Sequence, residues 1–194
     1  ENMAKGYATG IDFKLNGEFV KGVESWVSLS FMHTKEDIRG DQYTVSYDDG
    51  STELIKPGYY LRPTNQLMNF GLFFQDYLPN NPDYKVHLTF KYGSRLPYSS
   101  PDKDRYDNNF ELPPYRRVDI GFSKAIIQNR NSNSFRFIEN AWISAEIFNL
   151  LGINNTISYI WVRTVQNQSN IPGQFAVPNY LTGRRFNIKL VMKF

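Results

Sequence analysis

The sequence has no cysteine and no apolar run long enough to form a membrane helix. Without cysteine the chain has neither a disulfide framework nor a thiolate metal site, although this fixes no compartment. A membrane helix needs about 18 or more apolar residues, whereas charged residues make up 21% of this chain and its mean hydropathy is −0.49. The sequence therefore excludes a helical membrane protein. It does not exclude membrane-spanning strands, which need only about 9–11 residues each.

Clustered positive charge is also scarce. The net charge is +3 and the pI is near 9.0, and the densest basic pairs are Arg116–Arg117 and Arg184–Arg185. A nucleic-acid-binding protein would show a basic stripe or patch, so we expect no nucleic-acid partner. The chain begins at Glu1 with neither an initiating methionine nor a signal peptide, which indicates a fragment or a processed product.

Signals for catalysis and metal binding are weak. His33 and His87 lack the Ser and Asp partners of a catalytic triad, so we predict no enzyme. The stretch "SYDDGS" (46–51) places two acids beside a glycine, but it lacks the EF-hand spacing and the terminal Glu. We predict a plain turn, no metal site and no cofactor, and leave a loop-bound calcium ion open.

What the chain has in abundance is alternation of apolar and polar residues, with 15 Phe, 13 Tyr and 3 Trp. Period two predicts strands, and helical spacing is nearly absent. Seven long alternating segments stand out, at about 5–16, 24–34, 66–76, 84–94, 115–124, 140–149 and 184–194. One face of each segment is apolar and the other polar, with Phe73 and Val191 as the bulky exceptions on the polar face.

The links between these segments alternate in length. A short link lies around 16–22, a long one at 35–65, a short one at "DYLPNNPD", and further long ones near 95–114 and 150–183. Up-and-down strands place every second link at the same end of a sheet. Short periplasmic turns and long extracellular loops are typical of an outer-membrane barrel, which predicts a periplasmic C-terminus. The stretch "NTISYIWVRT" also reads as a strand, and we expect it to extend the last loop above the membrane.

The predicted fold is therefore an all-β, antiparallel, up-and-down transmembrane β-barrel. A soluble carbohydrate-binding β-sandwich also alternates apolar and polar residues. Segments of about ten residues exceed the usual strand length, and apolar faces crowded with Phe, Leu and Ile suit lipid better than a packed core. Seven strands is an odd number, and an open edge cannot stay unpaired in hydrocarbon, so we expect residues 1–194 to be one part of a larger barrel.

The sequence resembles the C-terminal portion of TonB-dependent outer-membrane receptors, particularly the SusC/RagA-like receptors of Bacteroidetes. The matching pieces are "GYATGIDFKLNG", "WVSLSFMHTK", "PPYRRVDIGFSK", "WISAEIFNLLGINN" and "GRRFNIKLVMKF". They contain a Pro-x-Tyr-x-x-hydrophobic-Asp strand (114–119), an Asn-Leu-Leu strand end (149–151), a Gly-Arg pair near 183–185 and the terminal Phe194. Each motif is weak alone, whereas their order and spacing are fairly specific.

The resemblance implies the last seven strands of a 22-stranded barrel with a plugged lumen. It implies TonB-dependent uptake of a glycan, a peptide or a metal chelate. The implied partners are outer-membrane lipid, the rest of the barrel with its plug, the TonB complex, the barrel assembly machinery and a SusD-like surface lipoprotein. A structural or secretion-associated barrel that imports nothing is the alternative.

Three sets of residues are candidates for function. One set should face the lumen and contact substrate, the plug or only water: Asp12, Lys14, His87, Lys91, Asp119, Glu146, Arg185 and Lys189. Another offers flat rings and donors in the loops, for ligand contact, loop packing or a lipoprotein lid: Tyr59, Tyr60, Arg62, Tyr98, Tyr106, Tyr159 and Trp161. The last strand resembles the assembly signal of such barrels, although Phe194 would also fit an aromatic girdle: Phe186, Ile188, Leu190, Met192 and Phe194.

Overall fold

The computed structural model describes residues 3–101, 103–104, 106–107, 110–128, 138–163 and 174–194. The protein is all-β, with antiparallel sheets and 70% of the described residues in strands. Among the described residues no helix is long and apolar enough to cross a membrane. The all-β, antiparallel part of the predicted fold is therefore confirmed.

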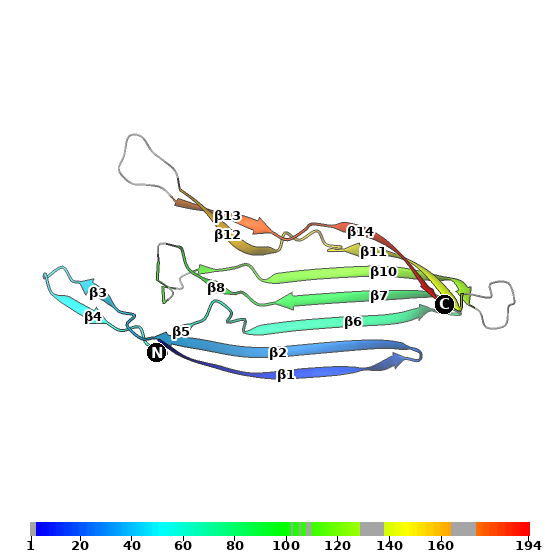
Figure 1. The fold of residues 1–194 in the computed structure, drawn as a ribbon, viewed down its shortest axis with the longest axis horizontal. Helices are drawn as coiled ribbons and strands as arrows, with labels where there is room; N and C mark the ends of the chain where they lie inside the picture. The colour runs from blue at the N-terminus through cyan, green and yellow to red at the C-terminus, as the bar shows by residue number, and fades with distance from the viewer. Residues whose placement is uncertain (1–2, 102, 105, 108–109, 129–137, 164–173) are drawn as a thin grey trace.

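Seven long strands form one antiparallel sheet in which neighbours in sequence are neighbours in space (Figure 1). The order is β1 (Ala4–Val20), β2 (Val23–Ile38), β6 (Met68–Leu78), β7 (Asn81–Gly93), β10 (Tyr115–Gln128), β11 (Asn140–Phe148) and β14 (Arg185–Lys193). An eighth, two-residue strand, β5 (Tyr60–Leu61), pairs with β2. The seven predicted segments are these seven strands, and the up-and-down order is confirmed.

The first two strands are longer than the sequence predicted. The link expected around 16–22 shrinks to Lys21–Gly22, because β1 continues to Val20 past a register shift between Gly17 and Val20. Gly22 has a φ of 85°, a conformation that glycine adopts without the strain of a Cβ atom. At the other end β2 extends to Ile38, beyond the apolar run that defined the predicted segment. Pairing with β1 maintains the extended backbone where the apolar alternation has ended.

The long links carry three hairpins that stand apart from the main sheet. They pair β3 (Tyr43–Ser46) with β4 (Thr52–Ile55), β8 (Pro97–Tyr98) with β9 (Phe110–Glu111), and β12 (Thr156–Arg163) with β13 (Gln174–Tyr180). All three lie toward the same end of the sheet, which we call the loop end, and the short turns lie at the opposite, turn end (Figure 1). The strand predicted from "NTISYIWVRT" is β12, outside the main sheet.

The strand register aligns residues of like character in rows across the sheet. One row joins Phe74, Leu88, Ile120, Ile147 and Phe186, and the rows beside it on that face are also largely apolar. On the other face one row joins Lys14, Ser28, Gly71, Lys91 and Arg117. A single register slip would have mixed the two faces, so the two-faced character predicted from the sequence is confirmed.

The prediction that Phe73 and Val191 are the bulky apolar residues on the polar face was incomplete. Trp26 is the partner of Phe73 and Trp142 is the partner of Val191, so both tryptophans lie on the polar face as well. Trp26 and Phe73 stack with ring centroids 6.2 Å apart. Each of these four bulky apolar residues on the polar face therefore lies opposite another one on the neighbouring strand, where the two side chains can interact.

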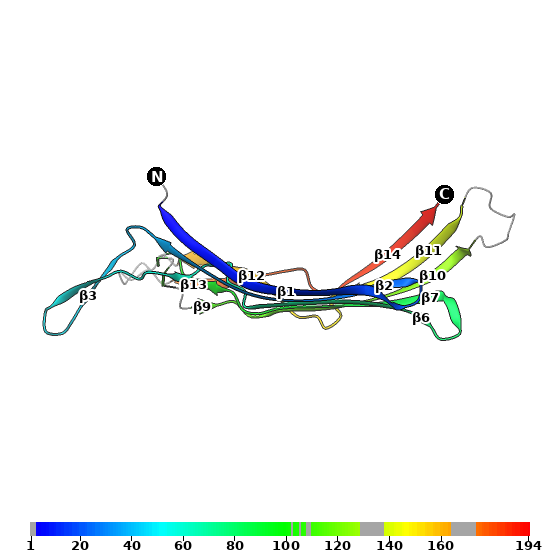
Figure 2. The ribbon, with the colours of Figure 1, turned by 90° about the horizontal axis from the view of Figure 1, so that it is seen from below.

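The main sheet is a single curved layer, and no second layer of described residues covers either of its faces (Figure 2). Phe186 and Ile188 on the apolar face are both 77% exposed, and Ile11, Phe13 and Leu15 are exposed as well. By contrast, Asp119 and Ser144 on the polar face are 8% and 7% exposed. Within the described residues β1 and β14 are the two edges of the sheet and do not meet. Closure into a barrel therefore stays a prediction.

The close approach of β1 to β2 yields a test of the register. A Cβ atom at Gly10 would lie 2.5 Å from the carbonyl oxygen of Phe31, whereas one at Gly17 would meet nothing within 4 Å. We expect Gly10→Ala to lower the free energy of unfolding by about 1–3 kcal/mol, because backbone must shift. Gly17→Ala is the matched control on the same strand and should be close to neutral. Urea titration of both variants measures the difference, and equal stabilities would contradict this register.

Candidate functional site

The register places all eight predicted lumen residues on the polar face of the sheet. Lys14 and Lys91 share one row, and His87 and Glu146 lie in another on either side of Gly121. Asp12, Asp119, Arg185 and Lys189 occupy further rows of this face, opposite Ser30, Thr89, Phe148 and Ser144. That this face borders a lumen stays a prediction.

Glu146 holds two neighbours on the polar face. Its carboxylate lies 3.7 Å from Nε2 of His87 and accepts a hydrogen bond of 2.8 Å from the amide of Asn187. The imidazole of His87 occupies the space that a side chain at Gly121 would fill. Since Glu146 has both neighbours within the sheet, the arrangement stabilises the sheet and offers little to a ligand.

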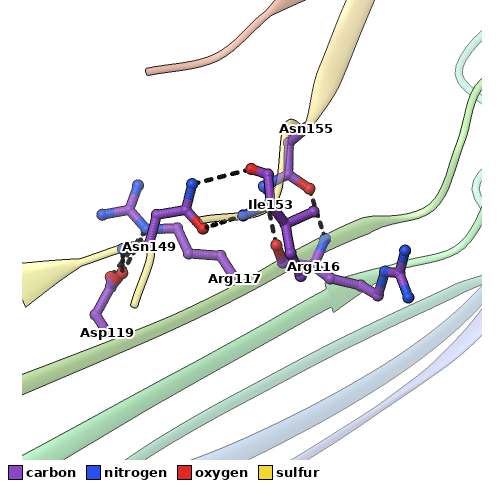
Figure 3. Close-up of polar contacts among 6 residues, drawn as sticks. All are labelled: Arg116, Arg117, Asp119, Asn149, Ile153 and Asn155. Carbon is purple, nitrogen blue, oxygen red and sulfur yellow. Dashed lines mark hydrogen bonds and ion pairs between the residues drawn. The ribbon is translucent and has the colours of Figure 1, made fainter. Parts of the chain in front are cut away.

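Asp119 has a structural role that its predicted lumen position did not suggest. It is 8% exposed, and its carboxylate accepts two bonds from Nε of Arg117, at 2.7 and 2.9 Å. It also accepts a bond of 2.7 Å from the backbone N–H of Asn149, where β11 ends (Figure 3). The Arg117 guanidinium and the Asn149 N–H thus both bond this carboxylate, so Asp119 ties the chain after β11 to β10.

Two asparagine side chains extend this connection into a feature that we call the asparagine latch, formed by Asn149 and Asn155. The amide of Asn149 donates to the carbonyl of Ile153 (2.9 Å) and accepts from its N–H (3.1 Å), which closes the turn. The amide of Asn155 accepts from the N–H of Arg116 (2.8 Å) and donates to its carbonyl (2.9 Å), as a neighbouring strand would (Figure 3). The latch joins the last long link to β10 at the loop end of the sheet.

Part of the latch coincides with the sequence motifs described above. Asp119 and Asn149 both belong to the motifs on which the resemblance to TonB-dependent receptors is based. The role of Asn155 was missed, because its partner Arg116 is 39 residues away. Asn149 has a φ of 52°, a conformation that asparagine tolerates better than most residues. That preference is the local signal that marks the turn.

The predicted loop candidates do not form one cluster. Tyr98 stacks on Tyr159, with centroids 5.0 Å apart and planes inclined by 19°, and it also stacks on Phe110 at 5.4 Å. Arg62 pairs with Glu36 at 3.3 Å, and Tyr59 lies 5.5 Å from Tyr7. Trp161 is part of the separate β12–β13 hairpin, opposite Ala176.

A second aromatic group joins two different loops. Tyr60 is buried, donates to Asp41 (2.9 Å) and meets Tyr106 edge-on at 6.2 Å. Tyr106 stacks on Tyr43 at 5.3 Å, and its bond to Asp104 raises the pKa of the Tyr106 phenol to about 12. These contacts use the rings for packing between loops, which was one of the three roles expected of them. Whether any of them contacts a ligand stays a prediction.

A hollow of about 490 Å³ lies at the loop end of the polar face, and the sequence did not predict it. Its lining comes from β2, β6, β7 and the chain just after the latch, including Trp26, Ser28, Asn69, Lys91, Thr156 and Ile157. This volume lies in the range of small-molecule sites. Of the predicted lumen residues, Lys91 is the one that lines it within the described part of the chain.

No metal site emerges in the residues that the structure describes: none of them form a group of three or more His, Cys, Asp or Glu suited to a metal ion. At the stretch where calcium was left open, Asp49 accepts bonds from the N–H (2.8 Å) and hydroxyl (2.6 Å) of Ser51. These bonds lower the pKa of the Asp49 carboxyl. They form the plain turn that the sequence predicted, and the prediction of no cofactor stays untested.

Comparison of the chain with protein-family models, with curated proteins and with solved structures finds no match. The resemblance to TonB-dependent receptors therefore depends on the motifs in the sequence and stays a prediction. The structure adds a physical role for two of those motifs, because Asp119 and Asn149 bond to each other across 30 residues.

The latch can be tested through its distal half. Asn155→Ala leaves the N–H and carbonyl of Arg116 without their partners, and we expect a local cost of about 1–3 kcal/mol. Hydrogen exchange at the Arg116 amide should accelerate, and proteolysis between β11 and β12 should increase. Asn179→Ala is the matched control, since Asn179 makes one exposed bond of 3.3 Å to Ser158. Equal exchange rates in the two variants would show that the latch does not hold this segment.

Proposed function

We propose that residues 1–194 form the C-terminal part of the barrel wall of a TonB-dependent outer-membrane receptor that imports a nutrient. The observation that carries this proposal is the uncovered apolar face of a single-layer sheet whose other face is polar. A patch of this size costs too much to leave in water, so it calls for a partner of matching chemistry. Lipid tails on one side and a hydrated lumen on the other supply that match.

The height of the apolar face supports a bilayer as that partner. On β7 this face runs from Tyr84 to Tyr92, eight residue steps that span about 26 Å at about 3.3 Å each. The apolar band of membrane barrels is about 25 Å tall, with aromatic girdles at both borders. On β10 the partners of these tyrosines are Lys124 and Arg116, and Nζ of Lys124 lies 5.2 Å from the Tyr84 ring. Asp76, opposite Val86, is an exception within the band.

The ends of the sheet support an orientation. Long links with tyrosine-rich hairpins gather at the loop end, and short turns such as Pro79–Asn80 lie at the turn end. In the proposed receptor the loop end is extracellular and captures the ligand, with or without a SusD-like lipoprotein. TonB then displaces the plug, and the ligand passes along the polar face. The strand that carries the proposed assembly signal, β14, ends at the periplasmic side.

Two alternatives make different demands. A soluble carbohydrate-binding sandwich needs a second sheet over the apolar face, and in the described residues the remaining strands form short hairpins at the loop end instead. A secretion-associated barrel has the same wall but no TonB-contacting segment. Photo-crosslinking of the complete protein to the periplasmic domain of TonB distinguishes import from that second alternative.

Orientation is tested by cysteine labelling, because the chain has no cysteine of its own. Asp48→Cys lies at the tip of the β3–β4 hairpin, and Pro79→Cys lies in the turn between β6 and β7. A membrane-impermeant maleimide should label the first in intact cells and the second only after the outer membrane is opened. Labelling of both in intact cells, or recovery of the protein in the aqueous fraction without detergent, would contradict the proposal.

The solvent of each face is tested by adjacent residues of one strand. Leu88 lies on the apolar face and Thr89 on the polar face of β7. We expect the added fluorescence of Leu88→Trp to be blue-shifted and strongly quenched by brominated acyl chains after reconstitution into vesicles. Thr89→Trp, the matched control, should show little quenching beyond the unsubstituted protein. Equal quenching of the two variants would mean that neither face is selectively in contact with lipid.

A further inference from the structure

We propose that the hollow at the loop end of the polar face binds a sugar ring that carries a carboxylate. In this assignment Nζ of Lys91 binds the carboxylate and the indole of Trp26 packs against the ring. The inference rests on the proposed function, because an imported ligand reaches this face only if the face borders a channel. It goes beyond that function by naming the charge and shape of the ligand.

Two glycines form the floor of the hollow. Gly71 on β6 and Gly93 on β7 lie on the polar face in adjacent rows, opposite Lys91 and Asn69 respectively. A Cβ atom at Gly71 would lie 3.0 Å from the Trp26 ring and from Oγ of Ser28, and one at Gly93 would lie 2.5 Å from Nε2 of Gln66. Larger residues at either position would collide with these side chains, so the two glycines let Trp26 and Gln66 lie close against the sheet at the floor of the hollow.

The indole of Trp26 is held in place before any ligand arrives. It lies over Gly71 on one neighbouring strand and stacks on Phe73 at 6.2 Å, with the planes inclined by 26°. A large aromatic ring on an otherwise polar face is costly unless it has a partner. An aromatic ring provides apolar area for the C–H face of a sugar, with little loss of side-chain entropy because packing has already fixed it.

Polar groups beside the indole are equally fixed. The amide of Gln66 donates to the carbonyl of Ser94 (3.1 Å) and accepts from Nδ2 of Asn69 (3.0 Å). The hydroxyl of Ser94 accepts from the N–H of Met68 (3.0 Å). This chain of bonds leaves Oδ1 of Asn69 as an acceptor at the hollow, where Ser28 and Thr156 add hydroxyl groups. Neutral donors and acceptors around an aromatic ring match a polyol.

The charge at the hollow selects among polyols. Lys91 is exposed and, within the described part of the chain, forms no ion pair, and no carboxylate side chain lines the hollow. Arg117, in the same row, is engaged by Asp119, and Asp12 lines a neighbouring hollow. A cation with no acid beside it favours an anionic ligand, and a carboxylate on the sugar ring would satisfy it.

The latch completes the hollow. Thr156 and Ile157 form one wall, and they directly follow Asn155, whose amide is bonded to Arg116. The wall therefore stays in place only while the last long link remains joined to β10. This dependence gives the site a second, indirect variant: Asn155→Ala should weaken binding without removing any group that contacts the ligand.

The experiment is calorimetry on the complete protein in nanodiscs, with trisaccharides of galacturonate, glucuronate and mannuronate, and with maltotriose as the neutral probe. We expect at least one uronate to bind and maltotriose to bind at least about tenfold more weakly. Lys91→Gln should weaken uronate binding by about tenfold or more, since a charge-assisted bond is lost. Lys14→Gln is the matched control, because Lys14 shares the row of Lys91 but does not line the hollow.

The outcomes separate this inference from the proposed function. Failure of all three uronates to bind overturns it, as does uronate binding that Lys91→Gln and Lys14→Gln affect equally. Equal binding of maltotriose, unchanged by Lys91→Gln, overturns the assignment of charge. None of these results touches the orientation of the loops or the lipid contact of Leu88, which are measured without a ligand. Loss of those signals would instead defeat the proposed function.

Discussion

The structure depends on one constraint: an apolar sheet face over which the described residues place no second layer. Burial of apolar surface is the dominant favourable term in folding, and here the residues that should supply it, from Ile11 on β1 to Ile188 on β14, are turned outward. Within the described residues the sheet is stabilised instead by its hydrogen-bond ladder and by the polar face. Burial of these apolar residues has to come from outside the described residues, and the proposed function depends on what covers this face.

On the polar face, close packing of side chains against the sheet takes the place of a buried core. Large side chains lie over glycines of the next strand, as His87 does over Gly121 and Trp26 over Gly71. Charged groups bond within the sheet, as Glu146 does with Asn187. Lys85 extends the pattern at the turn end, where Nζ lies 4.2 Å from the ring of Trp142. Small residues thus leave room for large neighbours on the same face of the sheet.

Local periodicity explains how much of this fold the sequence could predict. The alternation within each strand, such as Phe186 to Phe194, depends only on neighbouring residues, so the seven strands and their two faces were predictable. The hollow was not, because Gly71, Lys91 and Thr156 come from separate strands whose register no single segment reveals. The true extent of β2 was missed for the same reason, since its last four residues, 35–38, are extended through pairing with β1 rather than through their own pattern. The function predicted from the order of the motifs stays a hypothesis. It is physically consistent with an apolar sheet face that the described residues leave exposed.

The latch shows how a loop can be positioned by the wall that it leaves. β11 ends at Phe148, while β10 begins at Tyr115, so the upper part of β10 lacks a strand partner on that side. The backbone N–H of Leu150 bonds the carbonyl of Val118 at 2.7 Å, and the Asn155 amide then occupies the next place along the edge. Unsatisfied backbone groups at a strand end therefore become the anchor for the following link. The same bonds position Thr156 and Ile157, which line the hollow. The bonds that satisfy the backbone at the edge of β10 therefore also fix one wall of the hollow.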